Sequence, residues 1–326
     1  MRVAVLGATG AVGGMILRLL EDRLPEVEEI VPLASARSSG REIEWRGRNW
    51  RIEEPGPDTL SGCELAFFSA GATRSREWAP VAVDGGAVVI DNSSAWRLDP
   101  EVPLIVPEVN GDRTKDLPRG IIANPNCVVI QVALVLEALR RRAGLRRAVV
   151  SSYQAVSGAG RAGAEALSVE LDGGTPEASP FPARIMGNVI PLIGELDSDG
   201  WTDEEEKLRA ESRKILGLPD LAVAATCVRV PVEVGHAVSL TIECAEPIDL
   251  PTAEEALEEM PGVTLHRGDE LPPLPSAVAG TDLVRVGRLR LDRDLPGVVH
   301  LWVVADNLRR GAATNAVEIA AALGRA

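Results

Sequence analysis

The chain has 326 residues, more than one hydrophobic core usually organises, so two domains are expected. Its 34 basic and 48 acidic residues give a net charge of −14. That balance argues against nucleic acid or an anionic membrane as a partner, because both require a basic surface. The four cysteines lack C-x-x-C spacing, and the three histidines lack a carboxylate pattern between them, so neither a disulfide framework nor a metal site is expected. No leader precedes the first strand and no apolar run approaches the ~18 residues of a membrane span, which predicts a cytoplasmic protein.

A glycine-rich turn follows the first predicted strand. Residues 1–6 are largely apolar, GATGAVGG comes next, and MILRLLEDR has helical spacing. In the context of strand, turn and helix, such glycines let a pyrophosphate approach a helix N-terminus, although glycine turns that bind nothing are common. Its place at the start of an α/β pattern favours nucleotide binding. The residues expected to contact the cofactor here are Gly7, Thr9, Gly10, Ala11, Val12 and Gly13.

The end of the next predicted strand, EEIVPLASARSSG, indicates which nicotinamide nucleotide is bound. Folds that prefer NAD usually carry an acidic residue about 20 residues past the glycines, for the ribose 2′-hydroxyl. Ser35, Arg37 and Ser38 occupy that region instead, and a cation with two hydroxyl groups suits the 2′-phosphate of NADP. A solvated loop arginine is the alternative, and use of both nucleotides stays open.

Two further strands complete the pattern of the first half. They are predicted at CELAFFSAG and AVVIDNSS, with the helical segment RSREWAPVAVDGG between them. Alternating strands and helices predict a doubly wound, Rossmann-type parallel sheet. Both strands end in small polar residues, where such folds place their ligands.

Cys127 lies between a polar turn and a long apolar segment. Asn124-Pro125-Asn126 has the chemistry of a turn, and the apolar run from Val128 ends at RRRAG, which predicts a helix. Cys127 would then stand at a helix N-terminus, where unpaired N–H groups and the helix dipole favour a thiolate over a thiol. A packed small hydrophobe is the alternative, and position alone does not separate the two.

The second half differs in kind from the first. A strand, glycine-rich turn and helix in RAVVSSYQAVSGAGRAGAEALSVEL precede strand-rich regions at 221–247 and 297–307, which predicts an α+β domain with a mixed sheet. An apolar-faced helix then ends the chain. The predicted domains are 1–126 together with 307–326, for the nucleotide, and 127–306, for catalysis and dimerisation. His236 is the best candidate for the base that a catalytic cysteine needs.

Ten segments, in order, resemble the signatures of the aspartate-β-semialdehyde dehydrogenases. They are GATGAVG, LASARSSG, VIDNSSAWR, VPLIVPEVN, IIANPNC, YQAVSGAG, NVIPLIGE, DEEEKLRAESRKIL, CVRVPVEVGH and DNLRRGAATNAVEIA. They run from residue 7 to residue 320, so the resemblance covers essentially the whole chain.

The resemblance implies a role for each member of a set of residues. The catalytic residues would be Cys127 as nucleophile, Asn126 beside it, Gln154, which orients the acyl group, and His236 as acid/base. The substrate-binding residues would be Arg229 for the α-carboxylate, Glu204 for the α-amine, and Arg97 and Lys207 for phosphate. The residues against the nicotinamide would be Ser157, Gly158 and Asn307. From local sequence alone, Glu204 and Lys207 would be exposed helix residues.

The implied reaction is the NADPH-dependent reductive dephosphorylation of L-aspartyl-4-phosphate to L-aspartate-4-semialdehyde. The thiolate attacks the acyl phosphate, phosphate leaves, and the thioacyl enzyme accepts a hydride before it collapses to the aldehyde. A place in the biosynthesis of lysine (through diaminopimelate), threonine, methionine and isoleucine follows from the same resemblance. So does a homodimer built through the second domain.

Two other functions compete with this one. A related acyl-phosphate reductase, such as N-acetyl-γ-glutamyl-phosphate reductase, would share the cofactor, but an acetylated amine would not require Glu204. A noncatalytic nucleotide-binding paralogue is disfavoured because the nucleophile, its base and Arg229 are present together. A purely structural protein fits worst, since it would not need the glycine turn.

The residues after the nucleophile depart from the family pattern. Val128 and Val129 stand where similar enzymes carry small hydroxyl residues. A hydroxyl contact to phosphate or cofactor is therefore not expected at this point.

Overall fold

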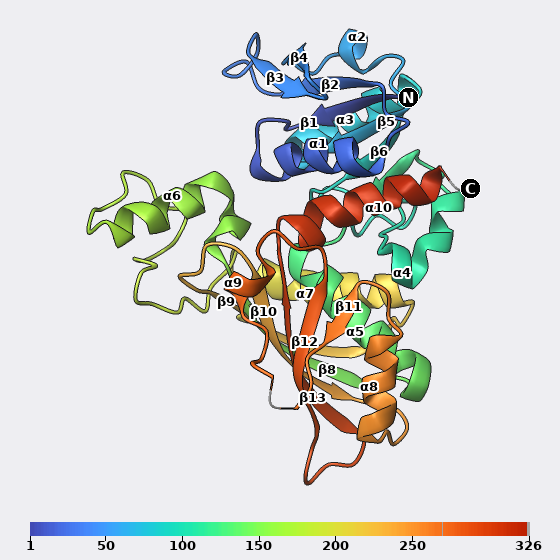
Figure 1. The fold of residues 1–326 in the computed structure, drawn as a ribbon, viewed down its shortest axis with the longest axis vertical. Coiled ribbons are helices and arrows are strands. Elements are labelled where there is room, and N and C mark those ends of the chain that lie inside the picture. The colour runs from blue at the N-terminus through green and yellow to red at the C-terminus, as the bar shows by residue number, and fades with distance from the viewer. Residues whose placement is uncertain (269, 325–326) are drawn as a thin grey trace. The chain divides into compact units, whose positions relative to one another are not determined.

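The computed structural model describes residues 1–268 and 270–324, which form two compact units (Figure 1). The first contains Met1–Asn126 and the C-terminal segment from Ala312, and the second contains Cys127–Gly311. The sequence places the start of the C-terminal segment at 307, but residues 307–311 group with the second unit, because the Asn307 side chain is hydrogen-bonded within it.

A five-stranded sheet with the order β2-β1-β5-β6-β7 forms the centre of the first unit. Every neighbouring pair is parallel, which confirms the predicted doubly wound architecture. The elements of this unit are β1 (Arg2–Leu6), α1 (Ala11–Arg23), β2 (Glu29–Leu33), β3 (Glu42–Trp45), β4 (Arg48–Arg51), α2 (Pro57–Leu60), β5 (Leu65–Phe68), α3 (Ala72–Asp84), β6 (Val88–Asp91), α4 (Pro107–Asn110), η1 (Gly111–Lys115), β7 (Ile121–Ala123) and α10 (Thr314–Leu323).

The strands of this sheet are buried along almost their whole length, as expected for a parallel sheet covered by helices. Helices α1 and α10 pack against each other and share one apolar core with β1, β5 and β6 (Figure 1). Helix α3 packs against β5 and β6. The unpredicted strand β7 immediately precedes the turn at 124–126 and adds the edge of the sheet.

The hairpin of β3 and β4 is also absent from the sequence prediction. Its turn residues Arg46 and Gly47 both have positive φ, 51° and 68°, as in a type I′ turn, but Arg-Gly lacks the usual Asn-Gly signal. The Arg46 guanidinium stabilises this backbone by donating to the carbonyls of Glu21 (3.1 Å) and Leu24 (3.2 Å) at the end of α1. It also lies 4.5 Å from the centre of the Trp45 ring.

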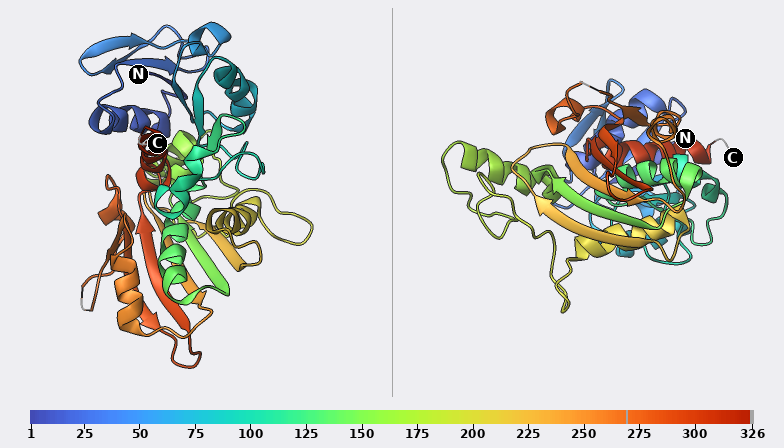
Figure 2. Two further views of the ribbon diagram at one scale, coloured as in Figure 1. Left: turned by 90° about the vertical axis from the view of Figure 1, so that its right-hand side faces the viewer. Right: turned by 90° about the horizontal axis from the view of Figure 1, so that it is seen from below.

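A six-stranded mixed sheet with the order β11-β12-β13-β10-β8-β9 forms the second unit. The outer pairs β11–β12 and β8–β9 are parallel, and the inner pairs are antiparallel, so the predicted mixed sheet is confirmed; Figure 2 shows its long strands side by side. The elements are α5 (Cys127–Ala143), β8 (Arg147–Gln154), η2 (Val156–Ala159), α6 (Gly160–Leu171), α7 (Asp203–Leu216), β9 (Ala222–Arg229), β10 (His236–Glu243), α8 (Leu250–Glu258), β11 (Val263–Leu265), α9 (Pro275–Val278), β12 (Val284–Leu291), β13 (Val298–Ala305) and η3 (Arg309–Ala313).

Helices α5, α7 and α8 pack together on one face of this sheet. Strand β8 shows the consequence, because residues that alternate along it are buried while Val149, Ser151 and Tyr153 between them are half-exposed. On strand β13, which β10 separates from β8 in the sheet, Trp302 is half-exposed in the same way. Within residues 1–268 and 270–324, no helix is both long and apolar enough to cross a membrane.

Candidate active site

The predicted site residues divide between the two units. In the first unit, the glycine turn joins β1 to α1. Gly7 has a φ of 93°, and a Cβ at that position would lie 2.4 Å from the Ser69 carbonyl oxygen. A Cβ at Gly13 would lie 2.1 Å from the Gly7 carbonyl oxygen. Gly10, the N-cap of α1, brings no side chain to the helix start, so the first-turn N–H groups of α1 can donate hydrogen bonds to a phosphate. Thr9, Ala11 and Val12 belong to the same turn and helix start.

The predicted 2′-phosphate site lies in a tight turn directly after β2. The Ser35 carbonyl accepts the N–H groups of Ser38 (2.8 Å) and Ser39 (3.2 Å). Arg37 is exposed at the tip of this turn, and Ser38 is buried in it. Because β1 and β2 are neighbouring parallel strands, this turn and the glycine turn lie at the same edge of the sheet.

Arg97 is fixed by backbone carbonyls in the first unit. Its Nε donates to the Asn124 carbonyl (2.9 Å) and its Nη2 to the Asn92 carbonyl (2.8 Å). The side chains of Asn92 and Asn124 are hydrogen-bonded (2.8 Å), and Asn315 donates to Asn124 (2.7 Å). Arg97 is buried, so its guanidinium is held in one orientation. The buried Asn126 ends this unit.

Cys127 is the first residue of α5, which confirms the predicted helix start. The turn η3 is packed against it, because a Cβ at Gly311 would lie 3.0 to 3.3 Å from the carbonyl oxygen, Cβ and Cα of Cys127. Val128 and Val129 are fully buried. These two positions therefore fill the core, which gives a packing reason for the apolar residues that depart from the family pattern.

The register of the second sheet brings three predicted residues together at one end of neighbouring strands. Gln154 at the end of β8 pairs with Arg229 at the end of β9, and antiparallel β10 begins beside them at His236. The backbone of Ala155 links two of them, because its carbonyl accepts Nη1 of Arg229 (2.6 Å) and its N–H donates to Nδ1 of His236 (3.0 Å). All three side chains are buried.

The bond from Ala155 determines the tautomer of His236. Since Nδ1 is the acceptor, the neutral ring carries its proton on Nε2. Nε2 is buried and has no hydrogen-bond partner within residues 1–268 and 270–324. Burial, with a smaller effect of the Arg229 charge, holds the pKa of His236 well below its usual 6.5. The resting ring is therefore a neutral donor whose Nε2–H has no partner in the described part of the chain.

Gly158 lies against both basic side chains. A Cβ at this position would be 2.8 Å from Nη1 of Arg229 and 3.2 Å from Nε2 of His236. Gly158 is not one of the glycines with positive φ. The requirement for glycine here is therefore steric, a reason that is separate from the predicted contact with the nicotinamide.

Helix α7 contributes Glu204 and Lys207 to this cluster. Glu204 is 7% exposed, whereas local sequence indicates an exposed residue. Its carboxylate accepts Nε2 of Gln154 (3.2 Å) and Nζ of Lys207 (3.3 Å). Lys207 also donates to Asp203 (2.7 Å). Burial would lower the pKa of Lys207, but attraction to Glu204 and hydrogen bonds to both carboxylates raise it above its usual value.

Cys127 interacts electrostatically with Arg229 of this cluster. Burial lowers the pKa of Arg229, and this effect is opposed first by Cys127 and then by Glu204. Burial also raises the pKa of the neighbouring Cys227 to about 12, so that thiol stays protonated and unreactive. Cys127 is the partly exposed thiol of the pair.

Ser157 and Asn307 form a network that the sequence does not reveal. Asn307 donates to the Ser157 hydroxyl (2.9 Å), and its Oδ1 accepts the N–H of Gly235 (2.9 Å). Gly235 precedes His236, so Asn307 helps to hold the start of β10. The bonded residues are 150 positions apart, and no local signal links them.

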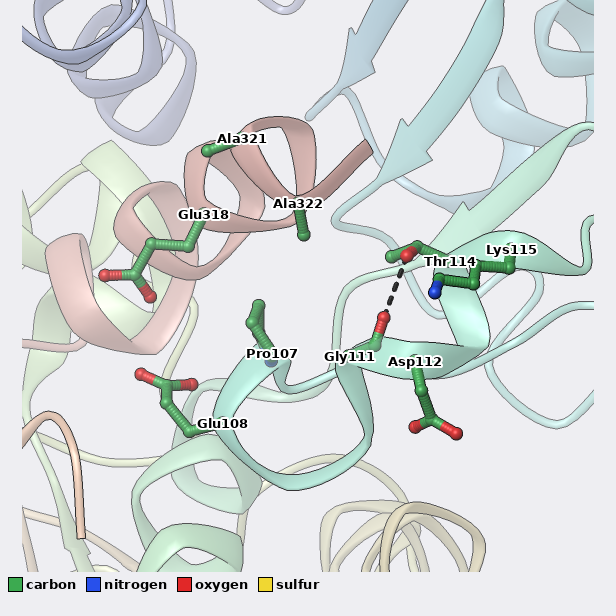
Figure 3. A pocket seen from close by; sticks show the side chains of 9 residues that line it. All are labelled: Pro107, Glu108, Gly111, Asp112, Thr114, Lys115, Glu318, Ala321 and Ala322. Carbon is green, nitrogen blue, oxygen red and sulfur yellow. Dashed lines mark hydrogen bonds between the residues drawn. The ribbon is translucent and has the colours of Figure 1, made fainter. Parts of the chain in front are cut away.

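A cavity of about 490 Å³ lies between the α4–η1 segment and α10 in the first unit (Figure 3). Its lining includes the carboxylates of Glu108, Asp112 and Glu318 and the amine of Lys115. It contains none of the predicted site residues and no thiol or imidazole. The cavity therefore offers neither the thiol nor the imidazole that the predicted acyl-transfer chemistry uses.

Comparison with known proteins identifies the family. A model described as the semialdehyde dehydrogenase NAD binding domain matches residues 2–117, and one described as the semialdehyde dehydrogenase dimerisation domain matches residues 136–310. The aspartate-semialdehyde dehydrogenase of Aquifex aeolicus is 45% identical over 329 residues, which cover 98% of this chain and 96% of that protein. The chain belongs to the aspartate-semialdehyde dehydrogenase family. Another member, from Bacillus subtilis, is 43% identical over 340 residues, or 99% and 97% of the two chains.

A solved structure from the same family has the same fold. Aspartate semialdehyde dehydrogenase II of Vibrio cholerae, complexed with ASA, has a TM-score of 0.96 at 42% identity and covers 99% of this chain and 98% of its own. Membership of the aspartate-semialdehyde dehydrogenase family confirms the resemblance read from the sequence. It makes the chain an oxidoreductase with a domain for a nicotinamide nucleotide.

Proposed function

We propose that this chain catalyses the NADPH-dependent reductive dephosphorylation of L-aspartyl-4-phosphate to L-aspartate-4-semialdehyde. The observation that carries the proposal is the cluster of buried Glu204 and Arg229 with Cys127 and His236 in one unit. A carboxylate and a guanidinium complement the α-amine and α-carboxylate of a free amino acid. An N-acetylated substrate has no ammonium group to offer Glu204, whose carboxylate would then keep only its bonds from Gln154 and Lys207, and this disfavours the N-acetyl-γ-glutamyl-phosphate reductase alternative.

Cys127 is the proposed nucleophile. Its sulfur attacks the acyl carbon of the substrate, the bond from that carbon to the phosphate oxygen breaks, and phosphate leaves with the bonding electrons. The position at the start of α5 favours the thiolate. The product of this step is a thioester on Cys127, with Asn126 as the adjacent residue in the chain.

When bound, the nicotinamide nucleotide supplies the hydride that converts this thioester to the aldehyde oxidation level. His236 stabilises the oxyanion that develops on the acyl oxygen, because its neutral ring presents Nε2–H as a donor. The carbonyl then re-forms and the thiolate leaves, so Cys127 is regenerated. The Nε2 proton can be shared with the oxyanion and returned when it collapses, which is the acid/base part of the role.

The remaining polar residues bind and orient the substrate. Arg229 binds the α-carboxylate, Glu204 binds the α-amine, and Gln154 connects to Glu204 and orients the acyl group. Lys207 and Arg97 bind phosphate. Arg97 suits this role because its guanidinium is already oriented by two backbone carbonyls, which reduces the conformational freedom lost on binding.

The first unit fits the nicotinamide nucleotide at two points. The glycine turn and the start of α1 would hold the pyrophosphate, since a Cβ would collide with the Ser69 carbonyl at Gly7 and with the Gly7 carbonyl at Gly13. Arg37, with Ser35 and Ser38, would hold the 2′-phosphate, so NADP is the proposed form. Ser157, Gly158 and Asn307 are proposed for the nicotinamide end.

We further propose that the protein is a homodimer, that it is located in the cytoplasm, and that it takes part in amino-acid biosynthesis. The half-exposed face of the second sheet, which includes Tyr153 and Trp302, is the proposed contact between two copies, in line with the dimerisation domain of the family model. All four cysteines are thiols rather than disulfides, as in a reducing compartment. The product would serve the biosynthesis of lysine (through diaminopimelate), threonine, methionine and isoleucine.

Steady-state kinetics of the reverse reaction tests the proposal. Purified protein should sustain steady reduction of NADP⁺ by L-aspartate semialdehyde only when phosphate is present, and N-acetyl-glutamate semialdehyde should be a poor substrate. A preference for the acetylated aldehyde would favour the alternative reductase. Binding of NADPH without turnover of either aldehyde would favour a noncatalytic paralogue.

A further inference from the structure

The segment 172–202, between α6 and α7, reaches the end of β9 at two points. Ile190 forms an antiparallel bridge with Arg229, with hydrogen bonds of 2.9 Å from the Ile190 N–H and 2.8 Å from the Arg229 N–H. Phe181 supplies the second contact, because its ring centre lies 5.9 Å from Cζ of Arg229. One segment therefore holds both the backbone and the guanidinium of the residue proposed to bind the α-carboxylate.

Phe181 is itself held in place by apolar packing. It packs against a small buried cluster that includes Val156, Leu167, Ile185 and Ile190. A Cβ at Gly163 of α6 would lie 3.2 Å from Cζ of the ring. The ring therefore lies in a defined position between helix α6 and Arg229.

The segment is also tied to α6 by a buried carboxylate. Glu170 is 3% exposed, and its Oε2 accepts the backbone N–H groups of Ile185 (3.0 Å) and Met186 (2.7 Å). Hydrogen bonds from two N–H groups satisfy this charge where water cannot reach it. The part of the segment that follows Phe181 is thereby anchored independently of Arg229.

The Phe181 ring can restrain the Arg229 guanidinium in a way that the other contacts of Arg229 do not. Nη1 donates to Ala155, and Gly158 is in close contact with the same nitrogen. A flat ring beside a guanidinium restrains rotation of its plane and leaves the in-plane N–H groups for a carboxylate. A bidentate bond to a carboxylate requires that plane to be fixed.

We infer that Phe181 is a specificity-determining residue that positions Arg229 for a free α-carboxylate, an inference that rests on the proposed function. A cavity of about 330 Å³ adjoins the ring and is lined also by Glu170, Ser179 and Arg184. Truncation of Phe181 would extend this cavity toward Arg229. The guanidinium would then gain both rotational freedom and water, and would distinguish a carboxylate from an uncharged group less well.

Phe181→Ala and Phe181→Leu test this role, with Leu196→Ala as the matched control because Leu196 is an exposed residue of the same segment. Both Phe181 variants should raise KM for aspartate semialdehyde about fivefold or more, in line with the loss of one cation–π contact, with kcat within about twofold. Phe181→Tyr should retain the wild-type KM. The ratio of kcat/KM for aspartate semialdehyde to kcat/KM for its α-carboxamide should decrease by the same factor in Phe181→Ala and Phe181→Leu. This ratio should not change in Leu196→Ala.

Labelling of Arg229 by phenylglyoxal, read by peptide mass spectrometry, supplies a measurement that needs no turnover. Removal of the ring should speed this labelling several-fold in Phe181→Ala and leave it unchanged in Leu196→Ala. Unchanged labelling and unchanged KM in folded Phe181→Ala would overturn the inference, as would full recovery of both by Phe181→Leu, which restores volume without a ring. A wild-type protein inactive on aspartate semialdehyde would refute the proposed function, and the labelling would still decide the role of Phe181.

Discussion

Gly158→Ala is the smallest change that should disable this site. The added methyl carbon would lie 2.8 Å from Nη1 of Arg229 and 3.2 Å from Cε1 and Nε2 of His236. Because Gly158 does not have a positive φ, alanine can adopt its backbone conformation without strain. The steric contact therefore decides the outcome.

Neither neighbour can move without losing a bond. Arg229 would have to leave the Ala155 carbonyl, which its Nη1 contacts at 2.6 Å, and His236 would have to leave the Ala155 N–H at 3.0 Å. Hydrogen bonds of charged groups contribute about 1.5 to 3 kcal/mol. If Arg229 loses one such bond, it also loses its fixed orientation toward the substrate. The expected decrease in kcat/KM is then about 10- to 100-fold, at about 1.4 kcal/mol per factor of ten.

The assay is phosphate-dependent reduction of NADP⁺ by aspartate semialdehyde, with NADPH binding followed in parallel by fluorescence titration. Gly111→Ala is the matched control, since its φ is −62° and its nearest contact is an ordinary 3.8 Å. We expect kcat/KM for the aldehyde to fall about 10- to 100-fold in Gly158→Ala, whereas the Kd for NADPH, whose nicotinamide end Gly158 is also proposed to contact, should rise by a smaller factor. Wild-type kcat/KM in Gly158→Ala would refute the steric reasoning, as would a loss of NADPH binding that fully accounts for the loss of activity.

Three other predictions concern the nucleophile, the cofactor and the imidazole. Cys127→Ser should abolish turnover and retain NADPH binding, whereas Cys244→Ser should remain active; loss of both properties in Cys127→Ser would indicate a structural role. Arg37→Ala should raise KM for NADP far more than for NAD, with the exposed Arg41→Ala as control, and equal effects on both nucleotides would contradict the 2′-phosphate site. The pKa of His236 is held below its usual 6.5 by burial, so below about pH 6.5 the unfolded ring takes up a proton that the native ring does not. The unfolding free energy should therefore fall with decreasing pH by up to about 1.4 kcal/mol per unit from this group, and urea titrations at pH 7 and pH 5.5 should show less fall in His236→Gln.

Local patterns were sufficient for the parts of the site that depend on neighbours in sequence. The glycine turn after β1, the turn at Arg37 and the start of α5 at Cys127 all follow from residues within about one helical turn of each other. The parallel and mixed sheets follow from the spacing of apolar segments. These features are the ones in which local chemistry and the final fold agree.

The features that could not be predicted from the sequence depend on contacts between residues that are far apart in the chain. Glu204 has the local pattern of an exposed helix residue, and its burial depends on Gln154, 50 positions away. The tautomer of His236 depends on a peptide group 81 positions away. Phe181 lies in a segment without regular periodicity, and its contact with Arg229 becomes visible only when the register of β9 is known.

The most direct test of the account is a stopped-flow measurement of NADPH formation when the protein is mixed with aspartate semialdehyde and NADP⁺, with and without phosphate. Without phosphate, we expect one rapid turnover per Cys127, which leaves a thioester on that residue that intact-mass analysis detects. Addition of phosphate should then release the thioester and start steady turnover. Steady NADPH formation without phosphate, or turnover that leaves Cys127 unmodified in its absence, would contradict the acyl-transfer mechanism.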